Sequence, residues 1–248
     1  MRSRIVPVCV ALLLSPLAGC NWFHDNILSK NKSVASNDEK PTKEKLISYL
    51  NRNAEQLDSI QVNNLGIEAK MGLGVARSIA LSGTMQAKKP RNFRLEGYLP
   101  GAKSDLVDLG SNEREFWFWV GADARASEAP YLYHCSHTDL PKAQLPLPIH
   151  PDWIMEALGM ATVVPSPNIR LEFARDGKTM ELIEPTRSPQ NQPMYKVTVF
   201  NARNVTGTEP QVLARKLVDA RGKTICIAEI KAMQLDPHSK ILVPHKID

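Results

Sequence analysis

Apolar residues recur along this chain with two different periods, which predict where helices and strands lie. In residues 42–57, Leu46, Leu50 and Leu57 fall near one stripe while the charged side chains project elsewhere. This spacing is typical of an amphipathic helix that lies against another element. From Ile60 onward the period changes to two, which is the side-chain period of a β-strand. The folded part of the chain is therefore predicted to begin with a helix and to continue with strands.

The clearest strand covers residues 93–99, where Phe93 and Leu95 alternate with Arg94 and Glu96. Such alternation indicates a sheet with one buried and one solvated face. The remaining strands are predicted by apolar alternation between turn residues. They cover residues 67–85, 106–109, 115–120, 131–136, 169–173, 179–183, 194–200, 211–218, 224–234 and 241–245.

Three interruptions organise this series of strands. Gly72 and Gly74 indicate a turn or bulge within the first segment, and Asp176-Gly177 is a hairpin signal. A proline-rich connector at residues 141–151 leads into a short predicted helix over residues 152–159. The fold class is mainly β with a few helices, that is, α+β. We predict a strongly curved antiparallel half-barrel of roughly eleven strands, with helices covering its concave face.

The N-terminus has the composition of an export signal. Arg2 and Arg4 precede a mostly apolar run at residues 5–14, and Leu17-Ala18-Gly19-Cys20 follows. A basic start, an apolar centre and small residues at the end are typical of a secretory signal peptide. The apolar run is too short for a retained transmembrane helix, which needs about 20 such residues.

The tetrapeptide Leu17-Ala18-Gly19-Cys20 resembles the lipobox of bacterial lipoprotein precursors. The resemblance implies diacylglycerol on the Cys20 sulfur, cleavage after Gly19 and acylation of the new amine; an ordinary signal peptide with a chance cysteine is the alternative. We therefore expect a signal peptide at residues 1–19, a lipidated Cys20 with a flexible tether at residues 20–41, and a single domain at residues 42–248. More than one acyl chain gives stable membrane anchoring.

Export and lipidation together predict a location in the bacterial cell envelope, with the domain facing the periplasm. Asn21 follows the lipidated position, where Asp is an inner-membrane retention signal in some bacteria. The outer membrane is therefore the favoured destination. Removal of Arg2 and Arg4 with the signal leaves 29 basic and 26 acidic residues, a balance too mild and too evenly spread for a nucleic-acid partner.

Two cysteines remain in the predicted domain, because Cys9 leaves with the signal and Cys20 is acylated. In an oxidising compartment two such cysteines often pair. Cys135 and Cys226 are therefore candidates for a disulfide. Two buried free thiols are the alternative, since sequence spacing does not give the distance between their Cα atoms.

The chain lacks the patterns that carry known catalytic or metal chemistry. His134 and His137 flank Cys135 in a way that invites a metal site together with His150, but residues 134 and 137 of a strand point to opposite faces. Gly72-Leu73-Gly74 lacks the third glycine of a dinucleotide fingerprint. Nucleophile-elbow, zincin and P-loop patterns are also missing from the sequence. We expect no catalytic residue, no metal site, no cofactor and no enzymatic activity.

The order of elements resembles that of the Lol-type periplasmic lipoprotein carriers and outer-membrane lipoprotein receptors. The sequence support lies in Ser82-Gly83-Thr84-Met85, in residues 89–96, in Leu109-Gly110-Ser111-Asn112 and in Glu115-Phe116-Trp117-Phe118. The resemblance implies an incomplete β-barrel, a helical lid and an apolar cavity for lipid or for the acyl chains of another lipoprotein. The proline-rich connector and the basic C-terminal end differ from the family.

A curved sheet with an apolar concave face needs something to cover it, either helices or a ligand. The predicted hydrophobic ligand-binding residues are Phe93, Leu95, Trp117, Trp119, Trp153, Leu158 and Phe173. A solid core filled by Trp153 and Leu158 is the alternative to a cavity. A second hypothesis for function is a structural or interaction lipoprotein that docks an envelope protein through the strand at residues 116–119, which is aromatic on both faces.

Overall fold

A computed structural model describes residues 40–71, 77–101, 105–121, 131–143, 152–203, 205 and 207–248. These residues belong to one compact unit that begins at Ser33. The predicted signal peptide, Cys20 and most of the predicted tether lie outside the described residues. None of the described helices is long and apolar enough to cross a membrane.

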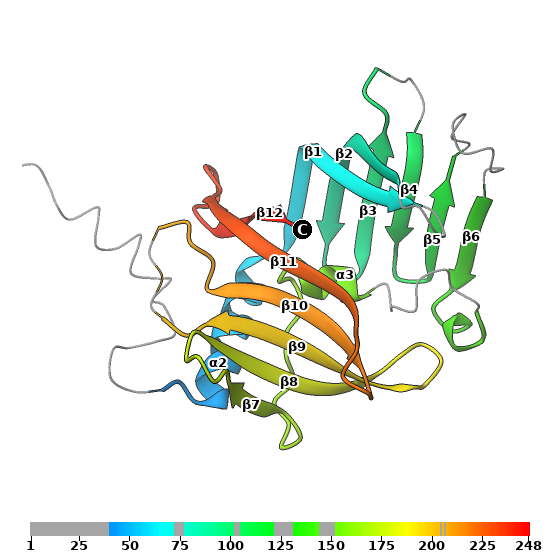
Figure 1. Cartoon of the computed structure of the whole chain (residues 1–248). Coiled ribbons are helices and arrows are strands. Elements are labelled where there is room, and N and C mark those ends of the chain that lie inside the picture. The colour runs from blue at the N-terminus through cyan, green and yellow to red at the C-terminus, as the bar shows by residue number, and fades with distance from the viewer. Residues whose placement is uncertain are drawn as a thin grey trace, which may run out of the picture. The chain divides into compact units, whose positions relative to one another are not determined.

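Twelve strands, all in antiparallel pairs, dominate the described part of the chain (Figure 1). The first sheet is a meander of β1 (Ser59–Met71), β2 (Arg77–Lys88), β3 (Asn92–Tyr98), β4 (Asp105–Ser111), β5 (Glu115–Val120) and β6 (Tyr131–Ser136). The second sheet contains β7 (Arg170–Phe173), β8 (Thr179–Arg187), β9 (Pro193–Asn201), β10 (Val212–Asp219), β11 (Thr224–Leu235) and β12 (Leu242–Ile247). The helical elements are α2 (Lys43–Gln56), η2 (Leu140–Lys142) and α3 (Asp152–Ala157).

The prediction of a mainly β, antiparallel fold with few helices is confirmed. The strand count differs by one because the segment predicted at residues 67–85 forms β1 and β2, which begin earlier, at Ser59, and end later, at Lys88. Gly72 and Gly74 lie between these two strands, outside the described residues. The described strands form two six-stranded sheets, whereas one curved sheet was predicted.

Helix α2 covers one face of the second sheet. Its N-cap is Thr42, whose side chain accepts a hydrogen bond from the Lys45 amide. The apolar stripe read from the sequence is the buried face, since Leu46 and Leu50 pack against Phe200 of β9. Burial of each such side chain stabilises the fold by about 1.5–3 kcal/mol. The other members of this cluster are Ile47, Ile169, Met180 and Leu182.

The two faces of the first sheet differ in polarity. Strand register places Met85, Leu95, Leu109, Phe118 and Tyr133 directly opposite one another across β2 to β6. We call these five residues the apolar row. The neighbouring positions point to the other face, which carries ion pairs that join Arg94 to Glu96 and to Asp108.

Candidate functional site

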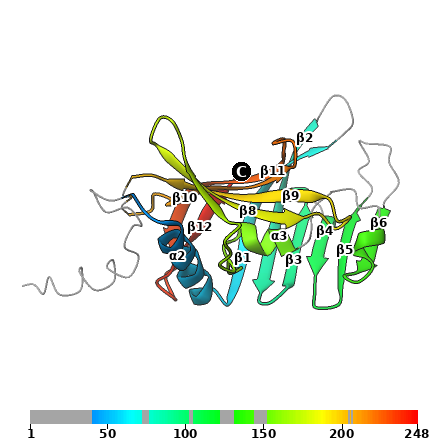
Figure 2. The ribbon, with the colours of Figure 1, turned by 90° about the horizontal axis from the view of Figure 1, so that it is seen from below.

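Helix α3 contacts both sheets (Figure 2). Its residues Met155 and Leu158, the latter just beyond the helix end, pack with Met85 and Phe93 of the first sheet. On its other side, Lys196 of β9 donates a hydrogen bond of 2.6 Å to Glu156 Oε1. The helix therefore joins an apolar surface of one sheet to a charged surface of the other.

The turn between β2 and β3 holds both helices. Arg91 Nη2 donates to Asp152 Oδ2 at 2.6 Å, at the start of α3, and Arg91 Nε lies 2.6 Å from Oδ1. One hydrogen bond and one ion-pair contact therefore tie the turn to the start of α3. Lys89 Nζ donates to the backbone carbonyl of Ala54 in the last turn of α2, where a cation is favoured by the helix dipole.

The apolar row changes from buried to accessible along its length. Met85 is 9 % exposed beneath α3, whereas Tyr133 on the edge strand β6 is 37 % exposed. Phe118 and Tyr133 stack with ring centroids 6.5 Å apart and planes at 19°. A partly exposed pair of stacked aromatic side chains offers a surface on which an apolar chain can pack.

Three of the seven predicted ligand-binding residues lie in one cluster, Phe93, Leu95 and Leu158. Two of them are almost completely buried, at 5 % for Phe93 and 7 % for Leu158. Side chains therefore fill the space around Phe93 and Leu158, as the solid-core alternative predicts.

Trp117 and Trp119 lie on the polar face of the first sheet, opposite to Phe93 and Leu95. The register pairs Trp117 with Gly110 and Trp119 with Asp108. The Trp117 indole lies against Gly110 and its Nε1 donates to Asp108 Oδ1 at 3.0 Å. The alternation of β5 therefore separates these two tryptophans from the apolar row.

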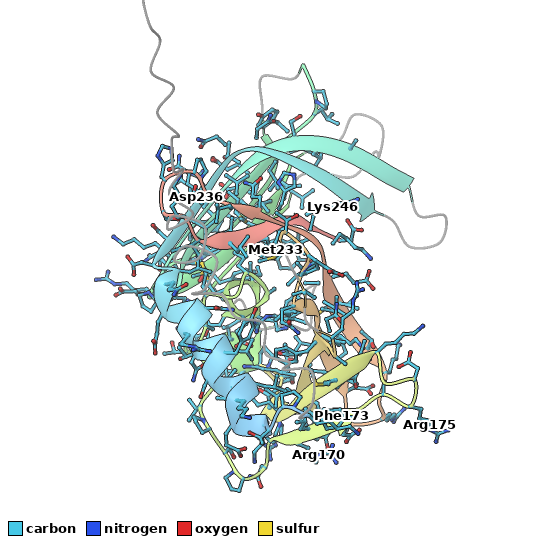
Figure 3. All side chains as sticks on the ribbon, turned by 90° about the vertical axis from the view of Figure 1, so that its left-hand side faces the viewer. Arg170, Phe173, Arg175, Met233, Asp236 and Lys246 are labelled. Atoms are coloured by element: carbon cyan, nitrogen blue, oxygen red, sulfur yellow. The ribbon has the colours of Figure 1, made fainter. Side chains whose placement is uncertain are left out.

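Phe173 lies far along the chain, on β7 at the edge of the second sheet (Figure 3). Its ring is partly exposed, and Lys40 Nζ lies 5.0 Å from the ring centroid, which is a cation–π distance. The structure thus places Phe173 away from the cluster that contains Phe93.

Trp153 does line a cavity, but charged residues form much of its wall. One cavity of about 200 Å³ and one of about 20 Å³ share Trp153, Glu156 and Lys196 as lining residues. The smaller also contacts Glu184 and Arg215 of the second sheet. The space beside Trp153 is therefore suited to a group that carries polar atoms.

Burial perturbs the charged residues beside this space. It raises the pKa of the Glu184 carboxyl, although the nearby Lys196 acts in the opposite direction. Burial also lowers the pKa of the Arg215 guanidinium, against the attraction of Glu156, Tyr49 and Glu184. In both cases burial disfavours the charged form of the side chain.

The sequence reasoning missed Glu184, Lys196 and Arg215. All three occupy positions on β8, β9 and β10 whose register places them on the same face as Leu182 and Phe200. The sequence signal for these residues was a charged side chain at a strand position that faces the core. Burial of a charge at such a position is unfavourable unless the charge is paired.

Cys135 and Cys226 are both free in the structure. They lie on β6 and β11, in different sheets. The disulfide is therefore not formed in the structure. Both thiols are free, as in the alternative, but they are half-buried and not buried. Burial raises the pKa of the Cys226 thiol to about 11.

The histidines considered for a metal site have other contacts. His134 Nε2 lies 2.9 Å from Glu115 Oε2, and His137 Nε2 lies 2.8 Å from the Asn112 carbonyl oxygen. His150 lies outside the described residues. Within the described ranges, no group of three or more histidine, cysteine, aspartate or glutamate residues has a metal-binding arrangement.

No protein-family model matches this chain, and no curated protein is significantly similar to it.

Proposed function

We propose that this chain is a membrane-anchored lipoprotein of the bacterial cell envelope that binds a hydrophobic ligand and catalyses no reaction. The ligand is a lipid or the acyl chains of another lipoprotein. The observation that carries the proposal is the apolar row, which is packed under α3 at one end and accessible at Phe118 and Tyr133 at the other. An acyl chain would pack on the accessible part of the row in the same way that α3 packs on the buried part.

In this proposal the two sheets act as one strongly curved half-barrel with the helices on its concave side. Packing of the first and last strands against one shared cluster supports this arrangement. Ile60 and Val62 of β1, Ile241 just before β12 and Val243 within it pack against the same apolar cluster as α3. The concave side would then contain both the apolar row and the face of the second sheet that α2 covers.

Ligand entry would displace α3 as a lid. The ion pairs at Arg91–Asp152 and Lys196–Glu156 are partly solvated, and such pairs contribute about 1 kcal/mol or less each. Exposure of Met155 and Leu158 would cost about 5 kcal/mol together. Since each buried methylene contributes about 0.8 kcal/mol, roughly six to nine methylenes of an acyl chain would offset this cost and that of the two ion pairs. Reversible exchange between lid and ligand is therefore energetically balanced.

The anchor part of the proposal is carried by Leu17-Ala18-Gly19-Cys20. Intact mass spectrometry of the protein purified from membranes should give acyl mass on a chain that begins at Cys20. The Cys20→Ala variant should lack that mass. An unmodified wild-type chain would refute lipidation.

The binding part is tested with a fluorescent fatty-acid analogue and the full-length Cys20→Ala chain, which has no acyl group of its own. Tyr133→Ser removes the accessible ring of the apolar row and should weaken binding about tenfold. Leu132→Ser is the matched control, because Leu132 is the adjacent residue, is 62 % exposed and pairs with Trp119 on the polar face. Equal binding by both variants and the parent would refute the apolar row as the ligand surface.

A second candidate function is docking of an envelope protein on β6. The observation that favours it is the exposed Leu132 on an edge strand, since edge strands and exposed apolar side chains are common interaction sites. In that case Leu132→Ser should abolish cross-linking of the membrane-bound chain to its partner. Tyr133→Ser by itself should not abolish it.

A further inference from the structure

Arg215 of β10 is an unusual cation among the described residues. Its Nε atom is buried and has no hydrogen-bond partner. No carboxylate of the described part of the chain lies within 4.0 Å of the guanidinium. Loss of hydration at this Nε without a direct partner is costly, and a well-placed anion would compensate it.

The neighbouring carboxylates are already engaged. Lys196 lies 2.6 Å from Glu156 Oε1 and 3.8 Å from Glu184 Oε1. The groups that face Arg215 electrostatically are Glu156 from α3, Glu184 from β8 and Tyr49 from α2. With Glu156 and Glu184 both beside Lys196, Arg215 keeps unused capacity for an oxyanion.

Space for such a group lies next to these side chains. Arg215 lines the cavity of about 20 Å³, and Lys196 lines both this cavity and the neighbouring one of about 200 Å³. Whole small-molecule ligands occupy about 300–1,000 Å³. The larger space is therefore sized for a headgroup, with the rest of the molecule outside it. Arg215 lines the smaller space, which shares Trp153, Glu156 and Lys196 with the larger one.

We propose that Arg215, assisted by Lys196, binds the anionic headgroup of an amphiphilic ligand beneath Trp153, as a carboxylate or a phosphate. This inference rests on the proposed function and narrows its ligand to anionic amphiphiles. The planar guanidinium can donate two parallel hydrogen bonds to two oxygen atoms of such a group.

The test compares ligands that separate head from chain. Dodecanoate carries both, 1-dodecanol carries the chain without the charge, and acetate and inorganic phosphate carry the charge without the chain. Binding to the full-length Cys20→Ala chain is measured by calorimetry. Dodecanoate should bind about 10–100-fold more tightly than dodecanol, as expected for charge-assisted hydrogen bonds.

Arg215→Met should reduce dodecanoate affinity to the level of dodecanol. Arg170→Met is the matched control, because Arg170 lies over the Tyr195 ring on the other face of the second sheet. If Arg215→Met does not fold, Arg215→Lys keeps the charge without the planar fork and should lose most of the preference for dodecanoate. Circular dichroism establishes which variants fold.

The outcomes distinguish the headgroup site at Arg215 from the proposed binding of a hydrophobic ligand. Equal affinity for dodecanoate and dodecanol, or an unchanged preference in Arg215→Met or in a folded Arg215→Lys, overturns the headgroup site while the hydrophobic function stands. Binding of acetate or phosphate that depends on Arg215, without binding of either amphiphile, supports an oxyanion site and overturns the hydrophobic function. Absence of binding by all four compounds overturns both.

Discussion

The ammonium group of Lys196 lies 2.6 Å from Glu156 Oε1 and thereby joins strand β9 to helix α3. The same ammonium lies 3.8 Å from Glu184 Oε1 on the neighbouring strand β8. Helix α3 has only six residues, and isolated helices of this length are unstable in water. Its position is therefore maintained by contacts such as this one and by burial of Met155.

Removal of the Glu156 charge should loosen α3 without unfolding the domain. In Glu156→Gln, Lys196 keeps Glu184 as a partner, so the free energy of unfolding should fall by about 1 kcal/mol or less. Hydrogen exchange at the α3 amides should become faster. Glu172→Gln on β7, at an exposed position, is the control and should leave α3 unchanged. Unaltered exchange in Glu156→Gln would show that this ion pair does not hold the helix.

Gly110→Ala should displace the Trp117 indole. A Cβ atom at residue 110 would lie 2.0 Å from the Cζ2 atom of Trp117, which is far inside van der Waals contact. We expect a loss of about 1–3 kcal/mol in the free energy of unfolding, as for other overpacked sites, and a change in tryptophan fluorescence as the bond to Asp108 breaks. Gly66→Ala on β1, where a Cβ atom meets nothing within 4 Å, is the control. Similar stability in both variants would contradict the observed contact.

Glu184 should make the domain less stable as the pH rises. Burial raises its folded-state pKa above the ordinary value of 4.5, so the folded chain binds the proton more tightly than the unfolded chain does. The free energy of unfolding therefore decreases as the pH rises from about 4.5 through the folded-state pKa. Glu184→Gln should lack this contribution. Urea unfolding of both chains between pH 4.5 and 8 measures it, and identical pH dependence would refute the burial effect.

Cys226 should react slowly with alkylating agents. Its pKa of about 11, compared with an ordinary value of 9.0, reduces the thiolate fraction about a hundredfold at neutral pH, and the thiolate is the reactive form. Peptide mapping after iodoacetamide treatment should therefore show slow modification in the folded chain and fast modification in urea. Rapid modification of Cys226 in the folded chain would contradict its burial on β11.

The local elements could be predicted because their patterns depend on neighbouring residues alone. The stripe through Leu46 and Leu50 gave α2, and the alternation around Phe93 gave β3. The two faces of β5 were also visible, since Phe116 and Trp117 alternate along it. A two-residue period fixes which side chains share a face but does not show what covers that face.

The candidate site depends on contacts that the sequence does not contain. Arg215 and Glu156 are 59 positions apart in the chain, and their proximity follows from the way α3 lies against the second sheet. Phe173 looked equivalent to Phe93 in its alternation, but β7 is an edge strand of the other sheet. The division into two sheets is set by long-range pairing, for which the strand patterns carry no signal.

The central claim is that the domain holds a hydrophobic molecule along the apolar row. Native mass spectrometry of the full-length Cys20→Ala chain, followed by organic extraction and mass analysis of the extract, tests it most directly. We predict a retained lipid or acyl-bearing molecule that is lost or reduced in Tyr133→Ser and kept in Leu132→Ser. A folded chain that carries no hydrophobic molecule, and that acquires none when it is incubated with membrane lipid, would contradict the claim.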